Sequence, residues 1–228
     1  KAGLIVTPQE AQKSLDEFFE EHPKIKSFMK KQEKLLRKQG YIKSLFGTKR
    51  RLPQIYSEDN AEAAYAVRLA VNFPCQSAAS QMTLFGSILN YWRMKQGKFP
   101  TMEEVATVHD AVYENTAPEN INIWTVYEMW NTFRNPETKR YFGFQIDDVD
   151  MSMSFEIGRT MAEELPFIPL YDYTKLYTPD FNEEEYMAEY KKYAHIDISE
   201  FPKRFPKEFK MYEQYWNKNR TFRGFTFR

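Results

Sequence analysis

The stretch Ala106-Thr107-Val108-His109-Asp110-Ala111-Val112-Tyr113 places a polar His-Asp pair between two short runs of β-prone residues, 105–108 and 111–113. Two such runs separated by two residues predict a tight β-hairpin with the polar pair at its tip. A carboxylate at a hairpin tip is held rigidly and can face a cleft, and hard divalent cations prefer oxygen ligands. Asp110 is therefore a candidate metal ligand, although the same short pattern is about as often a purely structural turn.

Two longer stretches upstream extend this pattern. They read Gly40-Tyr41-Ile42-Lys43-Ser44-Leu45-Phe46-Gly47-Thr48-Lys49-Arg50-Arg51-Leu52-Pro53 and Arg68-Leu69-Ala70-Val71-Asn72-Phe73-Pro74-Cys75-Gln76-Ser77-Ala78-Ala79-Ser80. In order and spacing, these stretches and the His-Asp hairpin resemble family-A, DNA polymerase I-like enzymes of bacteria and bacteriophages. The resemblance covers roughly residues 3–165.

The resemblance implies an α+β fold. It would be the C-terminal half of a right-hand polymerase, with a palm-type antiparallel sheet and packed helices. Residues 1–60 would form the end of the fingers and a basic segment facing the primer-template, residues 61–165 the C-terminal palm with the His-Asp hairpin, and residues 166–228 an aromatic, basic C-terminal extension. The first residue is lysine, so we expect a processed product or a fragment of a longer protein.

The helix predicted after Asn60 carries Arg68 and Asn72 four residues apart, so both side chains project from one face. We expect Pro74 to kink or end this helix, because proline lacks the amide hydrogen, and Gln76 to open the next one. From the residues alone, the favoured interpretation is an exposed arginine and two helix caps. The resemblance implies instead that Arg68, Asn72 and Gln76 contact primer-template DNA near the primer 3′ end, where every paired base offers a minor-groove acceptor.

Residues 24–51 contain 11 basic residues and one acid, although the net charge of the whole chain is zero. Such a patch is a plausible phosphate footprint, and a solvated helix face explains its helical part equally well. The resemblance implies that Lys49, Arg50 and Arg51 contact the DNA backbone. In the family three basic residues usually follow the glycine directly, whereas here Thr48 intervenes.

At the hairpin, the resemblance implies that Asp110 binds a catalytic Mg²⁺ and that His109 contacts the primer end beside it. Two-metal nucleotidyl transfer needs more than one carboxylate, because two ions about 3.5–4 Å apart clamp the attacking and leaving oxygens. The family's other metal-binding aspartate and its nucleotide-binding finger helix have no counterpart in this chain. The glutamate that usually follows His-Asp is replaced by Ala111.

We therefore expect a split enzyme. This chain would be a C-terminal fragment or subunit of a DNA-directed DNA polymerase, which acts on primer-template DNA and dNTPs when assembled with an N-terminal polypeptide carrying the thumb, the rest of the palm and the fingers. One alternative is a non-catalytic DNA-binding accessory subunit, which Ala111 favours and the intact His109-Asp110 pair disfavours. Another is a single-subunit RNA polymerase fragment, although the blocks at residues 47–51 and 72–76 look more like DNA polymerases.

Elsewhere, Thr7-Pro8-Gln9-Glu10 predicts a helix N-terminus with a reciprocal capping box, and Gly40 predicts a left-handed helix C-terminus. Hydrophobic periodicity predicts the remaining elements. These are helices over residues 8–21, 24–39, 60–73, 77–94 and 180–193, a helix beginning at Pro118, and a half-buried strand over residues 150–158.

The C-terminal residues 167–228 contain 17 aromatic residues. Disordered segments are poor in aromatic residues, so we expect this extension to pack, either in a groove of its own domain or on a partner. The chain has one cysteine, Cys75, which excludes an internal disulfide and fits a reducing compartment. We therefore expect a cytoplasmic location, in the host cell if the source is a bacteriophage.

Overall fold

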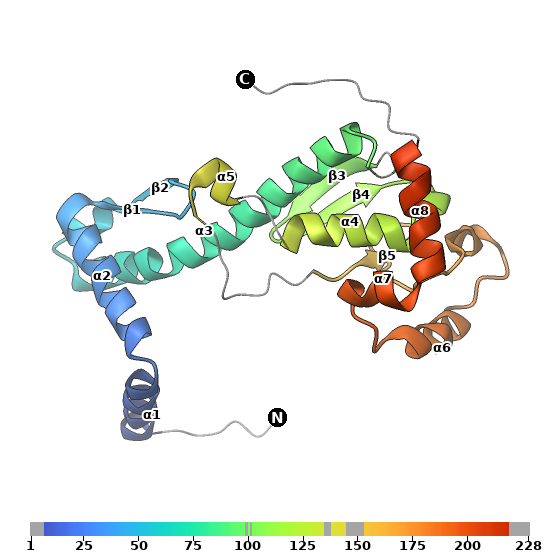
Figure 1. The fold of residues 1–228 in the computed structure, drawn as a ribbon. Helices are drawn as coiled ribbons and strands as arrows, with labels where there is room; N and C mark the ends of the chain where they lie inside the picture. The colour runs from blue at the N-terminus through green and yellow to red at the C-terminus, as the bar shows by residue number, and fades with distance from the viewer. Residues whose placement is uncertain (1–6, 99, 101, 135–137, 145–152, 219–228) are drawn as a thin grey trace. The chain divides into compact units, whose positions relative to one another are not determined.

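The structure is a computed structural model that describes residues 7–98, 100, 102–134, 138–144 and 153–218 (Figure 1). Over these residues it is an α+β structure that consists of helices and three two-stranded antiparallel sheets. The chain divides into two compact units, Lys1–Ala79 and Ser80–Arg228. The long helix α3 begins in the first unit and ends in the second.

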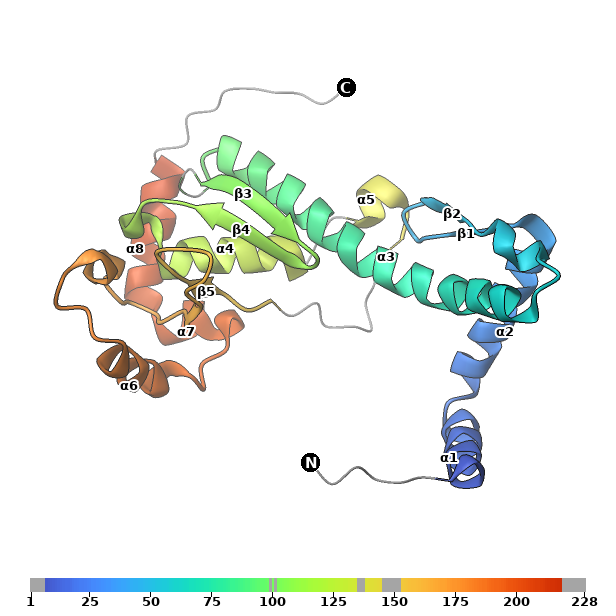
Figure 2. The ribbon, with the colours of Figure 1, turned by 180° about the vertical axis from the view of Figure 1, so that it is seen from behind.

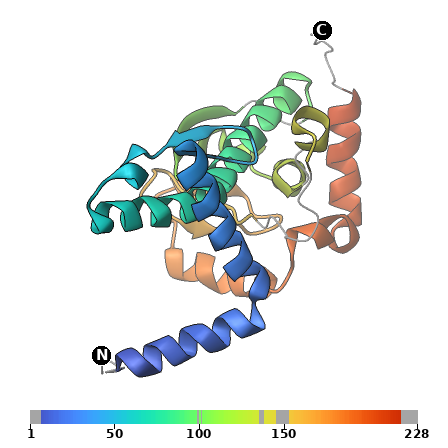
Figure 3. The ribbon, with the colours of Figure 1, turned by 90° about the vertical axis from the view of Figure 1, so that its left-hand side faces the viewer.

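The first unit is mainly helical and carries one short hairpin. Its elements are α1 (Pro8–Glu21), α2 (Pro23–Gln39), β1 (Tyr41–Lys43), β2 (Lys49–Arg51), the 3₁₀ turn η1 (Pro53–Tyr56) and the first part of α3 (Asn60–Lys95). The chain changes direction between α1 and α2 (Figure 3). The core of this unit is a cluster of aliphatic side chains from α2, the hairpin, η1 and α3, namely Leu36, Ile42, Leu52, Ile55, Ala66 and Ala70.

Both predicted helix ends in this unit are confirmed. The Thr7 hydroxyl accepts a hydrogen bond from the Glu10 amide at 3.3 Å, and the Glu10 carboxylate accepts one from the Thr7 amide at 2.9 Å. Gly40 ends α2 with a φ of 70°. A Cβ atom at position 40 would lie 3.3 Å from the Tyr56 ring, so both the backbone conformation and the close ring favour glycine.

Helix α3 corrects a prediction. It runs without interruption through Pro74, so the expected end of one helix and start of another around this residue is wrong. Proline in a helix forfeits one backbone hydrogen bond, here the bond to the Ala70 carbonyl. Ala70 itself is fully buried in the core. Packing of the apolar face thus maintains the helix across a residue with poor helix propensity.

Two helix N-termini differ from the prediction, one in its capping residue and the other in its position. Asp59, rather than Asn60, caps α3, because its carboxylate accepts a hydrogen bond from the Ala61 amide at 2.7 Å. Helix α4 (Ile123–Arg134) begins after Pro118, which lies in a separate 3₁₀ turn. In both places the residue directly before the helix, Asp59 or Asn122, accepts hydrogen bonds from free amides of the first helical turn.

The second unit combines a longer hairpin with several short elements (Figure 2). After α3 come β3 (Glu103–Val108), β4 (Ala111–Asn115), η2 (Pro118–Asn120), α4, α5 (Thr138–Phe142), β5 (Glu156–Ile157), β6 (Leu165–Pro166), η3 (Tyr173–Tyr177), α6 (Glu183–Tyr193), η4 (Ile198–Glu200), α7 (Phe201–Arg204) and α8 (Pro206–Lys218). The strand predicted over residues 150–158 falls partly outside the described residues. Of its described part, Glu156–Ile157 form a strand.

The aromatic extension packs, as expected, and it does so within its own unit. Its buried side chains surround Ile123 and Val126 of α4 in the largest hydrophobic cluster of the described residues. The extension supplies Phe167, Ile168, Tyr173, Leu176, Tyr186, Phe201 and Phe205 to this cluster. Tyr186 also donates a hydrogen bond from its hydroxyl to the Pro166 carbonyl at 2.7 Å, which ties α6 to β6. Over its described residues the extension is therefore part of the folded unit.

Candidate nucleic-acid interface and metal centre

The predicted His-Asp hairpin is confirmed. Strands β3 and β4 pair antiparallel, and Val108 faces Ala111 in the last pair before the turn. His109 and Asp110 are therefore the two residues of the turn itself. His109 has a φ of 56°, in the left-handed region that non-glycine residues seldom adopt. Two-residue hairpin turns of the favoured types need a positive φ, so this conformation sets the geometry of the tip.

Both tip side chains are exposed. The Asp110 carboxylate stands at a tight two-residue turn and can act as one oxygen ligand of a hard cation such as Mg²⁺. Over the part of the chain that the structure describes, no group of three or more His, Cys, Asp or Glu side chains could hold a metal ion. Asp110 thus fits a Mg²⁺ site as a single ligand, and the other ligands would have to come from elsewhere.

The base of the same hairpin holds a pair of carboxylates that the sequence analysis did not identify. Glu104 of β3 lies directly opposite Glu114 of β4. Burial raises the pKa of Glu114 to about 7, with the nearby Asn90 amide acting against this rise and the charge of Glu104 adding to it. No signal in the sequence reveals this pair, because a bulge between Glu104 and Ala106 sets the register.

The basic run predicted to contact DNA forms strand β2. Lys49 lies with its ammonium group 5.2 Å from the centre of the Tyr41 ring on the partner strand. The Arg50 guanidinium lies 5.7 Å from the centre of the Phe73 ring. Phe73 belongs to α3 and directly follows Asn72, so the basic strand lies beside the helix that carries the predicted DNA-facing residues.

The uninterrupted helix α3 aligns Arg68, Asn72 and Gln76. With 3.6 residues per turn, residues at i, i+4 and i+8 form one row along a helix. All three side chains are exposed, whereas Ala66 and Ala70 are buried against the core. Because α3 continues through Pro74, these three residues share one helix face, which two separate helices would not have provided.

The candidate residues fall into two groups. The first unit contains Arg68, Asn72 and Gln76, called the α3 row below. It also contains the basic strand β2 with Lys49, Arg50 and Arg51. The second unit contains His109 and Asp110. Each group is organised by its own local structure: a helix face with an adjoining strand in one unit, and a tight turn in the other.

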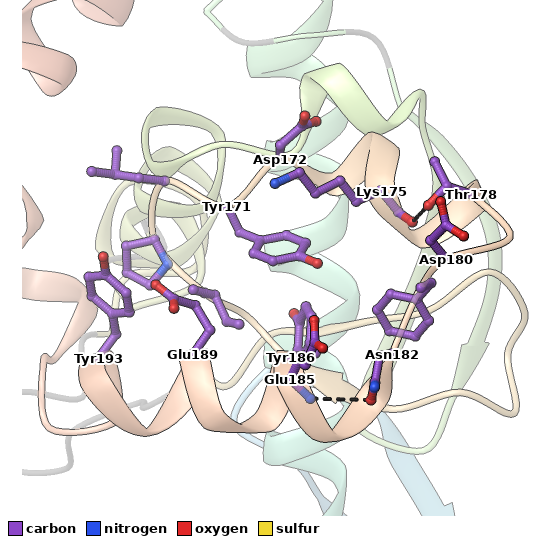
Figure 4. A pocket seen from close by; sticks show the side chains of 14 residues that line it. Tyr171, Asp172, Lys175, Thr178, Asp180, Asn182, Glu185, Tyr186, Glu189 and Tyr193 are labelled. Atoms are coloured by element: carbon purple, nitrogen blue, oxygen red, sulfur yellow. Dashed lines mark hydrogen bonds between the residues drawn. The ribbon is translucent and has the colours of Figure 1, made fainter.

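A pocket with a volume of about 680 Å³ lies between η3 and α6 (Figure 4). Its charged lining consists of Lys175 and four acids, Asp172, Asp180, Glu185 and Glu189. Burial raises the pKa of Tyr171, and the neighbouring carboxylates raise it further. The pocket is thus acidic and aromatic, and no motif in the sequence indicated it, because its lining comes from two segments without a recognisable pattern.

Among the described residues, no helix is both long and apolar enough to cross a membrane.

Relatives of the chain are DNA polymerases. It is 28% identical over 163 residues to the DNA polymerase of Bacillus phage SP01, and this match covers 71% of the chain and 17% of that protein. Over 107 residues it is 32% identical to the DNA polymerase of Escherichia phage T5, covering 46% of the chain and 12% of the relative. It is also 29% identical over 107 residues to DNA polymerase I of Caldicellulosiruptor bescii, a match that covers 47% of the chain and 12% of that relative.

The matched part is thus a small fraction of each of these relatives. The family model for DNA polymerase family A matches residues 1–163 and leaves out the aromatic extension, whose predicted start was near residue 166. With this match extending over well more than half of its length, the chain belongs to DNA polymerase family A.

Proposed function

We propose that this chain forms the end of the fingers (residues 1–60) and the C-terminal palm (residues 61–165) of a right-hand DNA-directed DNA polymerase that uses a two-metal mechanism. The observation that carries the proposal is the His109-Asp110 turn, which lies within the family match and presents an exposed carboxylate at a rigid tip. Such a carboxylate suits a metal ligand, because its position is set by the backbone on both sides.

Asp110 is the proposed ligand of a catalytic Mg²⁺. When bound, this ion would stabilise the charge that develops during phosphoryl transfer from a dNTP. The role of Asp110 is to hold the ion at a fixed position, and that of His109 is to contact the primer end beside it. Among the described residues, Asp110 belongs to no group of three or more potential metal ligands, which supports a site that is completed by other parts of the enzyme.

The α3 row is the proposed reader of the primer-template. Arg68, Asn72 and Gln76 are hydrogen-bond donors on one exposed helix face. In the minor groove every correct base pair presents an acceptor at a similar place, so these donors can test pairing geometry without reading sequence. Beside them, Lys49, Arg50 and Arg51 would neutralise backbone phosphates, which adds affinity without sequence preference.

We propose that activity requires an N-terminal polymerase portion with the thumb, the rest of the palm and the nucleotide-binding fingers. Surface properties support a large apolar contact. None of the residues of α1 is buried, and its apolar side chains Leu15 and Phe18 are half exposed. The β3–β4 hairpin is a two-stranded sheet, and such sheets are rarely stable without further cover. An interface above roughly 2,000 Å² of total buried area would be typical of such an obligate assembly.

The test is nucleotide incorporation by the chain, alone and co-expressed with the remaining polymerase segments. We expect incorporation in the assembly, its loss in Asp110→Asn, and nearly unchanged primer-template binding by that variant. The exposed acid Glu119 provides a matched control, and Glu119→Gln should behave as wild type. Near-normal incorporation by Asp110→Asn would refute the catalytic role, and a monodisperse, active monomer would refute the assembly.

A non-catalytic accessory subunit is the second candidate. It is favoured by Ala111, which stands where the family usually has a glutamate. An accessory subunit would bind primer-template DNA equally well with and without Asp110, and its assembly would polymerise normally after Asp110→Asn. The same variant therefore separates the two candidates. An RNA polymerase fragment is less well supported, because the matched relatives are named DNA polymerases.

A further inference from the structure

The base of the β3–β4 hairpin brings four oxygen-bearing side chains together in the second unit. Glu104 and Glu114 face each other across the two strands. Ser87 of α3 donates a hydrogen bond to the Glu104 carboxylate, and Asn90, one helical turn further on, lies next to Glu114. Ser87 is 5% exposed and Asn90 is 2% exposed. The cluster is thus partly enclosed between the hairpin and the helix.

A β-bulge creates the carboxylate pair. The register shifts between Glu104 and Ala106, which leaves Val105 without a partner and moves Glu104 opposite Glu114. Without the bulge, the register near the tip would pair Glu104 with Asn115 of the partner strand instead of with Glu114. Two like charges directly opposite each other destabilise a sheet. The bulge therefore produces an arrangement that is unfavourable unless something neutralises the pair.

Among the residues that the structure describes, no cation is paired with this carboxylate pair. One carboxylate oxygen of Glu114, Oε2, is buried without a hydrogen-bond partner among the described residues, and so are both side-chain atoms of Asn90. The nearest turn of α3 does offer a cation, Arg93, but its guanidinium is paired with Glu128 and with the Thr132 hydroxyl. A buried carboxylate oxygen and a buried amide that lack hydrogen-bond partners are both costly.

We propose that a hard divalent cation, with Mg²⁺ as the natural occupant, binds between Glu104 and Glu114, with the Asn90 side-chain oxygen as a third ligand. Two carboxylates and an amide oxygen are the ligands that Mg²⁺ and Ca²⁺ prefer, and water completes the coordination of such ions. Ser87 holds the Glu104 carboxylate by its hydrogen bond. Glu104 is exposed, which leaves a path for the ion to enter.

This site is separate from the tip of the hairpin. Three residues of β4 lie between Glu114 and the turn, which corresponds to roughly 10 Å along a strand. Two catalytic ions in a polymerase lie only about 3.5–4 Å apart, so an ion at the base is not one of them. Its effect would be structural: it joins the two strands to each other and to α3, and so fixes the hairpin that carries Asp110.

The test is a Mn²⁺ titration of the full chain, or of its assembly, followed by electron paramagnetic resonance. Mn²⁺ replaces Mg²⁺ at oxygen sites and reports bound and free ion directly. We expect Glu114→Gln, which keeps the shape and removes the charge, to weaken this binding by at least about 10-fold, a loss found even for outer-shell partners of metal ligands. Glu104→Gln alters an exposed residue, so it tests the site even if the buried variant folds poorly.

Glu119→Gln is the matched control, because it removes an exposed carboxylate outside the hairpin and leaves both the tip and the base unchanged. It should retain the binding that Glu114→Gln loses. In thermal melts, millimolar Mg²⁺ should raise the melting temperature of the wild type and of Glu119→Gln more than that of Glu114→Gln or Glu104→Gln.

Equal Mn²⁺ affinity in the wild type and in both glutamine variants would overturn the proposal. A wild-type melting temperature that does not change with Mg²⁺ and rises only at acidic pH would also overturn the proposal. In that case a shared proton, rather than a metal ion, would neutralise Glu104 and Glu114. Incorporation assays on Asp110→Asn decide the polymerase proposal separately, so either proposal can fail without the other.

Discussion

The two longer hairpins of the chain carry opposite charges and have opposite designs. The first, β1–β2, is joined by the five residues 44–48 and presents Lys49, Arg50 and Arg51. Two of these cations lie over aromatic rings. The second, β3–β4, turns in two residues, with a carboxylate at its tip and a carboxylate pair at its base. One hairpin is loosely connected and basic, and the other is tightly connected and acidic.

The difference between the two hairpins suits the ligands that each is proposed to bind. A phosphate backbone is a line of charges, and a cation helps to hold it from many positions. A metal ion accepts oxygen ligands only at defined distances and angles, so its ligands need a rigid support. We therefore expect charge to matter most in the first hairpin, and geometry to matter as much as charge in the second.

The largest effect should come from a change of geometry at constant charge. Asp110→Glu keeps the carboxylate and extends the side chain by one methylene group. We expect a loss of about 10²-fold in nucleotide incorporation by the assembled enzyme, because a displacement of about 1 Å can have that effect. The matched change in the basic hairpin, Arg50→Lys, should stay near wild type. Near-normal incorporation by Asp110→Glu would show that the two hairpins do not differ in their sensitivity to side-chain geometry.

A smaller effect is expected on the α3 row. Arg68→Ala or Gln76→Ala should slow primer extension by roughly 10-fold, since one good base contact is worth about 1–3 kcal/mol. The loss should be greater when the primer ends in a mismatch, because these donors are proposed to test pairing geometry. Single-turnover extension of matched and mismatched primers measures both rates, and equal losses on the two would indicate a structural role for these residues.

In the basic hairpin, the double change Lys49→Ala and Arg50→Ala should weaken primer-template binding several-fold at moderate salt. Each lost phosphate contact should also reduce the salt dependence of log affinity by about 0.9 for duplex DNA. Anisotropy titrations at several salt concentrations give this slope. Arg50→Lys keeps the charge and should keep the slope. An unchanged slope in the double variant would show that Lys49 and Arg50 do not contact phosphates.

The smallest effect concerns pH. Burial and the opposing Glu104 raise the pKa of Glu114 to about 7, so the folded protein binds this proton more tightly than the unfolded chain. With a chelator present, stability should therefore be greatest at acidic pH and should fall as pH rises from the ordinary glutamate pKa of about 4.3 toward 7. Thermal melts across this range should show the fall in the wild type, and Glu114→Gln should reduce it.

Local signals in the sequence predicted the parts of the fold that depend on neighbouring residues. The capping box at Thr7, the left-handed Gly40 and the two-residue turn at His109-Asp110 are all determined within a few residues, and all are confirmed. Pro74 misled the prediction for a related reason. Its local preference is to end a helix, but the burial of Ala70 on the same helix depends on residues far away in sequence.

The residues of the candidate site were likewise predictable only where a local sequence motif marks them. Asp110 could be found because it lies within a recognisable motif. The Glu104 and Glu114 pair could not, because one unpaired residue, Val105, decides whether the two carboxylates meet. The common face of Arg68 and Gln76 was likewise hidden, because it depends on whether the helix passes through Pro74.

The left-handed backbone at His109 has a consequence for how this turn can evolve. A φ of 56° is easily adopted by glycine, while other residues bear a cost of about 1–2 kcal/mol in this region. A glycine at this position would give an equally good or more stable turn, but without an imidazole. Under the proposal that His109 contacts the primer end, histidine here would lower stability in favour of activity. His109→Gly should then melt no lower than the wild type while extending primers more slowly.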